Sequence, residues 1–251
     1  TVSAYWNFKV TPNSHCSKNS EEDLALELRT LLTAAVKRRL VADVPVGVFL
    51  SGGIDSSAVL ACASEGETAG RIKTFSIGFR EKEFDESAMA KQIAKQFGAD
   101  HSEEIFGIDS AKDIADYVLS MLDEPMGDSS ILPTYLLSRF ARKSVTVALG
   151  GDGGDELFAG YAPFQALRLA QLYSDMLPKA LRSFILEQVN RLPASEGYLS
   201  IDFKLKRTLQ GLQYPPSAWN PAWLGPLRPD EISELMNTRV EWDEVYADAI
   251  D

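Results

Sequence analysis

The stretch Ser51-Gly-Gly-Ile-Asp-Ser56 has the residue types needed to bind a bulky anion such as a phosphate chain. Gly52 and Gly53 carry no Cβ, so the backbone can come close to the anion. The serines at either end, together with Ser57, add hydroxyl donors. A helix beginning here would add unpaired N–H groups and the positive end of its dipole. Asp55 would repel a phosphate unless a divalent cation lies between the two groups, so the stretch predicts a metal-assisted phosphate site.

Other phosphate-binding motifs fit this stretch less well. Leu50-Ser-Gly-Gly53 resembles the signature of ABC transporters, but that motif continues with Gln and requires a Walker A loop, which the chain lacks. The glycine fingerprint of dinucleotide-binding folds is also absent from this turn. The pattern S-G-G-x-D-S is similar to the PP-loop of the N-type ATP pyrophosphatases, which cleave ATP between its α- and β-phosphates to adenylate a substrate. This resemblance implies ATP and Mg²⁺ as ligands.

A second glycine-rich stretch, Gly150-Gly-Asp-Gly-Gly-Asp-Glu156, follows an apolar run and contains only glycines and acids. Its glycines permit close backbone approach to an adenosine or an α-phosphate. Asp155 is a natural partner of Asp55 for holding Mg²⁺ across the pyrophosphate. Glu156 could hold the substrate or assist proton transfer. The spacing of an EF-hand is not met, which counts against calcium.

Both stretches follow apolar runs that are typical of buried parallel strands. Four strands are predicted, at Val46–Leu50, Ile72–Phe79, Asp100–Phe106 and Ser144–Leu149. Helical patterns separate them, which predicts an open parallel α/β sheet with right-handed crossovers and helices on both faces. Ligands bind at the carboxyl ends of the strands in such sheets, where both glycine-rich stretches lie.

The helices between these strands carry recognisable ends and apolar faces. Ser20 is a suitable cap for a helix that reaches about Leu40 and ends on the basic run Lys37-Arg38-Arg39, which complements the helix dipole or points toward phosphate. A later helix has Gly98 as its closing C′ glycine. Its predicted apolar face is Met89, Ile93, Ala94 and Phe97.

Two further helices are expected before the fourth strand. One covers residues 110–122, and the next is capped by Asp128 or Ser129 and runs to about Lys143. The charged loop at residues 80–86 is a solvated rim or contributes Asp85 or Glu86 to a substrate site. His101 has only one other histidine in the chain, so a hydrolytic triad has little support and a structural role is favoured.

Composition limits the class of protein. The 251 residues carry a net charge of −11, which argues against non-specific binding to nucleic acid or to anionic membranes. Two cysteines, Cys16 and Cys62, do not suggest a disulfide framework, and Cys62 has the setting of a core residue. No apolar run is long enough for a transmembrane helix, and no signal peptide is visible, so a cytoplasmic protein is expected.

The chain divides by pattern into three parts. Residues 1–20 are polar and predict a linker from a preceding domain, residues 21–161 form the nucleotide-binding core, and residues 162–251 are helical patterns broken by prolines. A chain that begins with Thr and ends without a compact closing element is expected to be truncated at both ends. The basic cluster Lys204, Lys206 and Arg207 is predicted to be a solvated helix face or, less favourably, a phosphate contact.

The two glycine-rich stretches, together with Phe158-Ala-Gly-Tyr161, resemble the synthetase domain of the glutamine-hydrolysing asparagine synthetases. The resemblance begins near Tyr5-Trp6, ends at Tyr161 and includes Asp43–Gly47, Thr74–Gly78 and Asp123-Glu-Pro125. It implies an adenine nucleotide alpha-hydrolase-like fold. It also implies that aspartate and MgATP give β-aspartyl-AMP and pyrophosphate, and that ammonia then displaces AMP to form asparagine.

The resemblance assigns roles residue by residue. The pyrophosphate would be held by Ser51, Gly52, Gly53, Asp55 and Ser56. Adenosine would be contacted, largely through backbone, by Leu50, Ile77, Gly150 and Gly151. Mg²⁺ would be held by Asp55 and Asp155, and the substrate would lie near Asp152 and Glu156. A glutaminase domain is implied on the N-terminal side, and a homodimer is left open.

The chain departs from the family pattern at three positions of its acidic stretch. The usual sequence of the family is Ser-Gly-Glu-Gly-Ser-Asp-Glu. In this chain Gly150 replaces the first Ser, Asp152 replaces the first Glu and Gly154 replaces the second Ser. The identity of the carboxylate substrate therefore stays open. One alternative is a β-lactam synthetase-like enzyme, which adenylates a carboxylate and closes a ring without ammonia. Another is a nucleotide-binding module with impaired catalysis. This chain alone is expected to turn over slowly and only with free ammonia.

Overall fold

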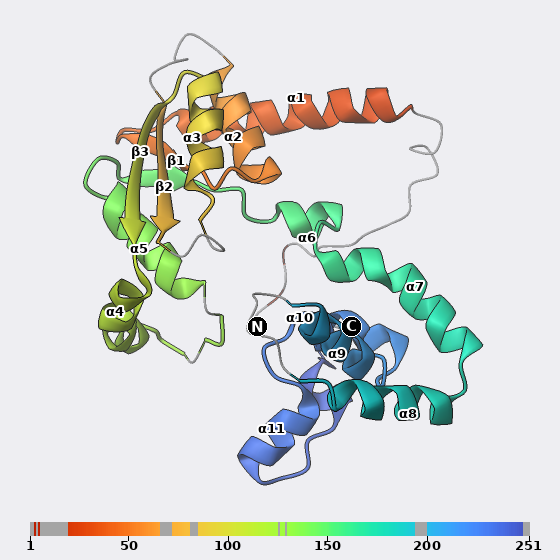
Figure 1. Cartoon of the computed structure of the whole chain (residues 1–251). Coiled ribbons are helices and arrows are strands. Elements are labelled where there is room, and N and C mark those ends of the chain that lie inside the picture. The colour runs from red at the N-terminus through yellow and green to blue at the C-terminus, as the bar shows by residue number, and fades with distance from the viewer. Residues whose placement is uncertain are drawn as a thin grey trace. The chain divides into compact units, whose positions relative to one another are not determined.

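The computed structural model describes residues 3, 5, 20–65, 72–80, 85–124, 126–128, 130–193 and 200–247 of the chain (Figure 1). The chain divides into two compact units. The first comprises residues 1–111 and 133–151, and the second comprises residues 112–132 and 152–251. Trp6, Cys16, Pro125, Ser129 and most of the predicted linker lie outside the described residues. The domain boundaries predicted above stay a prediction.

The elements alternate between helices and strands up to β4, in the order expected from the sequence. They are α1 (Glu21–Leu40), β1 (Val46–Phe49), α2 (Ile54–Ser64), β2 (Lys73–Phe79), α3 (Ser87–Gln96), β3 (Asp100–Phe106), α4 (Ile108–Ser120), α5 (Ile131–Ala141) and β4 (Val147–Leu149). The four strands form one parallel sheet in the order β3-β2-β1-β4. The predicted open parallel α/β sheet is thus confirmed.

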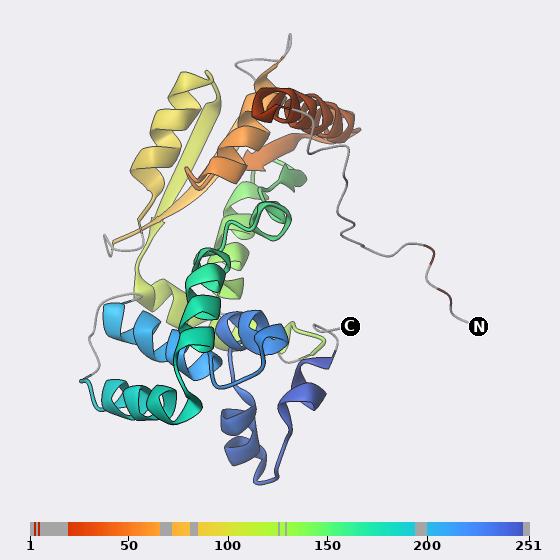
Figure 2. The ribbon, with the colours of Figure 1, turned by 90° about the vertical axis from the view of Figure 1, so that its right-hand side faces the viewer.

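One face of the sheet is covered by α1, α2 and α3. Their apolar side chains form a core with Val48 of β1, the following Leu50, and Leu60 of α2, all of which are almost fully buried. Cys62 belongs to the same core, as predicted. Figure 2 shows α3 alongside β2 and β3. On the other face, Phe75 of β2 packs against residues of α5, so helices cover both faces as expected.

The helix ends follow the sequence signals. Ser20 caps α1 through a reciprocal capping box with Asp23, and Gly98 adopts the positive φ that a C′ glycine provides. The basic residues at 37–39 lie in the last turn of α1. Only Val36 of α1 is buried, and the leucines of its first half are exposed, so the helix is confirmed but its apolar stripe is wider than the face that it buries.

In the first unit, the start of the fourth strand and the apolar face of α3 differ from the sequence prediction. The fourth strand begins at Val147 rather than Ser144, because the N–H groups of Ser144 and Val145 bond the Ala141 carbonyl and so close α5. Met89 was expected on the apolar face of α3 but is 53% exposed. Ala90 is buried in its place, alongside the predicted Ala94, because small residues allow α3 to pack closely on the sheet.

The second unit is helical after β4. Its elements are α6 (Gly154–Phe158), α7 (Ala162–Met176), α8 (Lys179–Asn190), α9 (Ile201–Gly211), a 3-10 turn (Pro216–Ala218), α10 (Trp219–Leu224), α11 (Pro229–Met236) and α12 (Trp242–Val245). The described residues after β4 contain no strand, as predicted. Trp219 and Trp223 stack at 6.1 Å between ring centroids within the core of this unit. Among the described residues, no helix combines the length and apolar character needed to cross a lipid bilayer.

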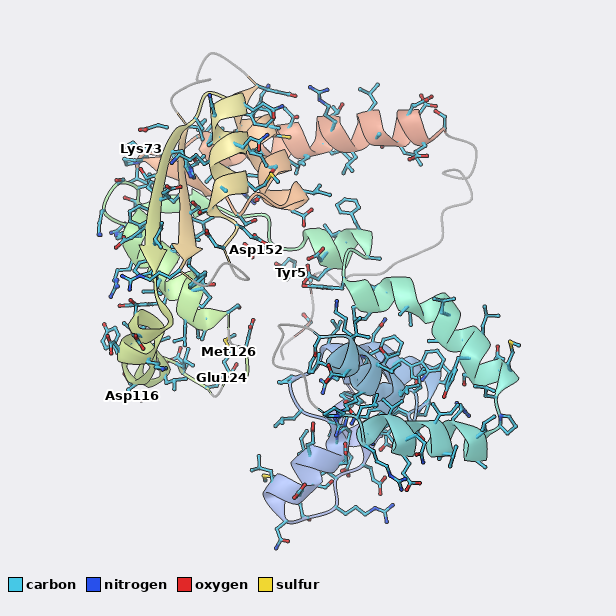
Figure 3. The ribbon with its side chains drawn as sticks, in the orientation of Figure 1. Tyr5, Lys73, Asp116, Glu124, Met126 and Asp152 are labelled. Carbon is cyan, nitrogen blue, oxygen red and sulfur yellow. The ribbon has the colours of Figure 1, made fainter. Side chains whose placement is uncertain are left out.

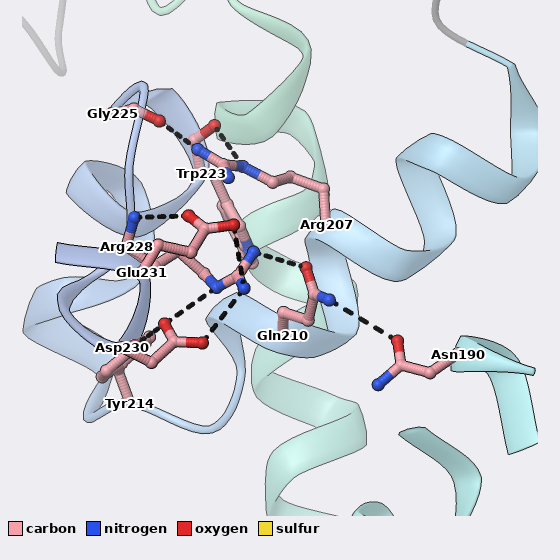
Figure 4. Close-up of polar contacts among 9 residues, drawn as sticks. All are labelled: Asn190, Arg207, Gln210, Tyr214, Trp223, Gly225, Arg228, Asp230 and Glu231. Carbon is pink, nitrogen blue, oxygen red and sulfur yellow. Dashed lines mark hydrogen bonds and ion pairs between the residues drawn. The ribbon is translucent and has the colours of Figure 1, made fainter. Parts of the chain in front are cut away.

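A polar network ties the helices of the second unit together (Figure 4). The Arg228 side chain, 13% exposed, donates to Asp230 and to Gln210 and forms an ion pair with Glu231. Arg207 donates to the carbonyls of Trp223 and Gly225. Lys204 of the basic cluster on α9 is exposed, as a solvated face predicts, whereas Arg207 is half-buried and binds backbone carbonyls.

Candidate nucleotide-binding site

The turn between β1 and α2 is held by hydrogen bonds among its own residues. The Ser51 N–H donates to the Ser56 hydroxyl over 3.3 Å, and the two serine hydroxyls are 3.0 Å apart. The Ser51 hydroxyl also accepts from the Gly53 N–H over 3.2 Å. Ser56 is buried, so this network sets the shape of the turn from below. The turn is preorganised through short contacts that its small side chains allow.

The first turn of α2 has no capping side chain, because Gly53 is the N-cap residue. The N–H groups of a first helical turn have no partner within the helix and lie at its positive end. A first turn of this kind is suited to bind an anion. The Ser57 hydroxyl donates to the Gly53 carbonyl over 2.6 Å. Its proton is thus directed into the helix, which differs from the expectation that Ser57 is a donor to the anion.

Two glycines allow other segments to pack against this turn. A Cβ on Gly52, whose φ is +90°, would lie 2.9 Å from the Ala90 nitrogen and from Met89, so α3 packs closely against it. A Cβ on Gly151 would lie 2.7 Å from the Ser56 nitrogen and 2.9 Å from the Asp55 Cβ. The segment after β4 therefore begins directly on the first turn of α2.

The predicted adenosine contacts are found at the ends of neighbouring strands. Strand β1 pairs with β2 on one side and with β4 on the other. Leu50 follows β1 and donates its N–H to the Phe75 carbonyl of β2 over 2.9 Å. Ile77 is half-buried near the carboxyl end of β2, and Gly150 follows β4. In the first unit, Leu50, Ile77 and Gly150 therefore lie at or near the carboxyl ends of three neighbouring strands.

The acidic residues after Gly151 belong to the second unit. Asp152, labelled in Figure 3, precedes the short helix α6, which carries Asp155 and Glu156 in its first turn. This helix begins after Gly153 at φ +89° and ends at Ala159 at φ +53°, so both ends use left-handed backbone. The Gly160 N–H bonds the Asp155 carbonyl over 3.0 Å. The two left-handed residues confine α6 to five residues.

Tyr161 fixes the carboxylate of Glu156. Its hydroxyl donates to Glu156 Oε1 over 2.5 Å, and both side chains are exposed. This hydrogen bond lowers the pKa of Glu156 and raises the pKa of Tyr161 to about 12, with Asp155 and Asp128 adding to the latter effect. Tyr161 is absent from the predicted site residues, although its position five residues after Glu156 could have suggested the contact.

The predicted metal ligands are divided between the units, Asp55 in the first and Asp155 in the second. No group of three or more potential metal ligands occurs among the described residues. The shared site of Asp55 and Asp155 stays a prediction.

Asp85 has a local role in the structure. Its Oδ1 accepts from the Ser87 N–H over 3.1 Å at the start of α3, and hydrogen bonds from Ser87 lower the pKa of Asp85. A Cβ on Gly78 would lie 2.8 Å from the same oxygen, so the carboxylate lies close to the end of β2. Asp85 therefore connects α3 to β2. No contact of Glu86 with the turn after β1 is seen.

Comparison with known proteins shows the family to which the chain belongs. The sequence profile of the asparagine synthase family matches residues 27–242. The chain belongs to the asparagine synthase family. The match covers the turn after β1, the acidic segment and most of the helical unit, so it joins the two regions that the sequence motifs singled out separately.

Individual relatives support this assignment. A relative from Methanocaldococcus jannaschii is 45% identical over 141 residues, which are 56% of this chain and 27% of that protein. A protein named as a glutamine-hydrolysing asparagine synthetase from Bacillus subtilis is 33% identical over 176 residues, 70% of this chain and 27% of its own length. One of the same name from Bos taurus is 30% identical over 187 residues, 70% of this chain and 33% of its own length. The chain thus spans about a quarter to a third of the relatives it matches.

Proposed function

We propose that this chain is the ATP-using part of an amide-forming ligase that converts aspartate to asparagine. The observation that carries the proposal is the uncapped first turn of α2 with Gly151 packed against it, in a chain of the asparagine synthase family. An oxygen of the aspartate side-chain carboxylate attacks the α-phosphorus of ATP, and the bond to the bridging oxygen breaks as pyrophosphate leaves. Ammonia then attacks the activated carbonyl carbon, loses a proton, and AMP departs.

The turn after β1 binds the leaving pyrophosphate in this proposal. Backbone N–H groups of the first turn of α2 donate to its oxygens, and the serine network holds the turn in place. Mg²⁺, held by Asp55 and Asp155, would offset the negative charge that builds up on the pyrophosphate. Leu50, Ile77, Gly150 and Gly151 contact the adenosine through their backbone.

The carboxylates of the second unit bind the amino-acid substrate in this proposal. Glu156 is ionised at neutral pH, as an exposed carboxylate normally is, and its hydrogen bond from Tyr161 lowers its pKa further. An ionised carboxylate binds the α-ammonium group of aspartate and is a poor general acid, and a lowered pKa also makes it a weaker general base. Of the two roles predicted for Glu156, substrate binding is therefore favoured, and Asp152 lies on the same segment. The relatives' names indicate glutamine hydrolysis, so the full-length protein is expected to obtain ammonia from an N-terminal glutaminase domain, in the cytoplasm.

Release of pyrophosphate tests the proposed reaction. The chain is incubated with MgATP and either aspartate, glutamate, another carboxylate or no acceptor, with and without ammonium chloride. Pyrophosphate that requires aspartate, with AMP and asparagine that require ammonia, is the expected result. Pyrophosphate release with another carboxylate and no need for ammonia would favour a β-lactam synthetase-like reaction. Nucleotide binding without pyrophosphate release under any condition would favour an impaired binding module.

A double-mutant cycle tests the shared metal. Asp55→Asn and Asp155→Asn keep the size of each side chain and remove its charge. If both carboxylates hold one Mg²⁺, each variant weakens MgATP binding by about tenfold or more, and the double variant is weaker by much less than the product of the two effects. Binding of metal-free ATP in EDTA is the control, and it is expected not to weaken, because without a cation the two carboxylates repel the phosphates. Independent, multiplicative effects of the two substitutions would contradict a shared ion.

A further inference from the structure

Polar side chains replace the expected apolar ones where α3 covers β2 and β3. Thr74 and Ser76 of β2 are almost fully buried, at 0% and 3% exposed, and the His101 side chain of β3 is 9% exposed. Thr74 pairs with His101 in the sheet, and Ser76 pairs with Glu103, so all four lie on one face. Buried polar groups are costly unless they bond one another. These buried polar side chains are therefore expected to form hydrogen bonds with one another.

The His101 imidazole bridges two residues of the neighbouring strand. Its Nδ1 is 2.9 Å from the Thr74 hydroxyl, and its Nε2 is 3.4 Å from the Ser76 hydroxyl. Both ring nitrogens are thus engaged with β2, so the imidazole lies along the strand. These side-chain contacts add to the backbone hydrogen bonds between β2 and β3. One of them is made to Ser76, the residue directly before Ile77.

Burial favours the neutral form of the imidazole. Burial lowers the pKa of His101, while Glu103, with Oε2 at 4.0 Å from Nε2, opposes this effect. Lys91 of α3 binds the same Glu103 carboxylate over 3.2 Å and lowers the pKa of His101 further. A neutral imidazole has one donor and one acceptor, which suits two hydroxyl partners. The ring therefore serves as a fixed hydrogen-bonding bridge.

We propose that His101 is a positioning residue for the nucleotide: through the Ser76 hydroxyl it fixes the carboxyl end of β2, where the backbone of Ile77 meets the adenosine. The role rests on the proposed function, which assigns that contact to Ile77. On the β1 side, β2 is paired only as far as Phe75, which accepts from the Leu50 N–H, whereas on the other side β3 stays paired with β2 as far as Phe79. The contact with Ser76 supports the nucleotide site, and the contact with Thr74 stabilises the sheet.

Two isosteric variants separate these contacts. In His101→Gln the terminal amide reaches the position of Nε2 and keeps the bond to Ser76, whereas in His101→Asn the amide takes the position of Nδ1 and keeps the bond to Thr74. Affinity for Mg²⁺ with α,β-methylene-ATP, which cannot be cleaved between its α- and β-phosphates, is measured by calorimetry. Exchange of the amide hydrogens of residues 74–80 is measured without nucleotide.

We expect His101→Asn to weaken nucleotide binding by about three- to tenfold, the effect of one net hydrogen bond, and to speed amide exchange at the end of β2. His101→Gln stays within about twofold of the parent. Ser76→Ala, which leaves the imidazole in place, repeats the effect of His101→Asn. A purely structural role predicts instead that both His101 variants, which each keep one contact, act alike.

The outcomes separate this role from the proposed function. A parent chain that fails to bind the nucleotide would overturn the proposed function, and this role with it. A parent that binds, with equal affinity in the Asn and Gln variants, would overturn the role of His101 alone. So would faster amide exchange in His101→Asn without a change in affinity, because positioning would then have no effect on the nucleotide.

Discussion

The turn after β1 and the acidic helix α6 are both glycine-rich segments that follow a strand, yet they are built differently. The turn after β1 is fixed by several hydrogen bonds among its serines and backbone, and α3 packs against its Gly52. Helix α6 has five residues, left-handed ends and no buried residue, and its Glu156 is exposed. The Glu156 carboxylate has one strong side-chain partner, the hydroxyl of Tyr161.

This difference predicts different weaknesses. In the turn after β1, backbone groups bind the anion in our proposal and the side chains are redundant, so added volume does more harm than a lost hydroxyl. In α6, side chains bind the substrate in our proposal, so loss of the Tyr161 hydroxyl should weaken substrate binding. A Cβ added at Gly153, directly before α6, would have no atom within 4 Å. In the turn after β1, adding a methyl group should therefore do more harm than removing a hydroxyl, and in α6 the order should be reversed.

The largest effect is expected for Gly151→Ala. The new Cβ would lie 2.7 Å from the Ser56 nitrogen and 2.9 Å from the Asp55 Cβ, and neither backbone can yield without moving the first turn of α2. We expect MgATP affinity to fall by about 100-fold, which corresponds to about 3 kcal/mol of overpacking. Calorimetric titration measures the affinity, and circular dichroism checks that the fold is retained.

Gly153→Ala is the matched control in the same segment. Gly153 has φ +89°, so alanine costs about 1–2 kcal/mol of backbone strain, but no atom lies within 4 Å of its Cβ. Nucleotide affinity should stay within about threefold of the parent, while aspartate-dependent turnover falls because α6 is disturbed. Equal losses of nucleotide affinity in the two variants would refute close packing as the cause and leave glycine flexibility as the common factor.

Much of the turn after β1 could be predicted from the sequence because its geometry follows from local chemistry. A strand, two glycines and the start of a helix allow few arrangements. Strand β1 and helix α2 lie where the apolar pattern predicted them. The position of Gly151 on α2 needed the strand order β2-β1-β4, which local patterns do not contain. The shape of α6 depended on Ala159, a residue without the usual preference for positive φ.

Side-chain partners were less accessible to sequence reasoning. His101 was expected to be structural, but its two partners come from another strand and their register is set by the sheet. Arg207 looked like part of a solvated cluster because its carbonyl partners lie 16 and 18 residues further along the chain. Met89 was misplaced because a helical stripe fixes a face only within about one residue, and Ala90 packs more closely.

An intermediate effect is expected for Tyr161→Phe. The substitution keeps the ring and removes the hydrogen bond that lowers the pKa of Glu156, so the pKa of Glu156 rises toward its ordinary value. Aspartate-dependent pyrophosphate release should fall by about tenfold through a higher KM for aspartate, with little change in nucleotide affinity. The acid limb of the pH profile should move to higher pH, because protonation then removes the charge of Glu156 at a higher pH. A loss of nucleotide affinity with an unchanged KM for aspartate would contradict the role given to Glu156.

The smallest effect is expected for Ser57→Ala, which also removes one hydroxyl and so is the counterpart of Tyr161→Phe in the other region. The Ser57 hydroxyl donates to the Gly53 carbonyl, which already accepts from the Ser57 N–H over 3.1 Å. Because that carbonyl keeps its backbone partner and alanine favours helices, MgATP affinity should change by less than about twofold. A drop of tenfold would mean that the Ser57 proton turns outward to the phosphates when nucleotide binds. The turn after β1 would then rely on its side chains as α6 does, and the contrast between the two regions would fail.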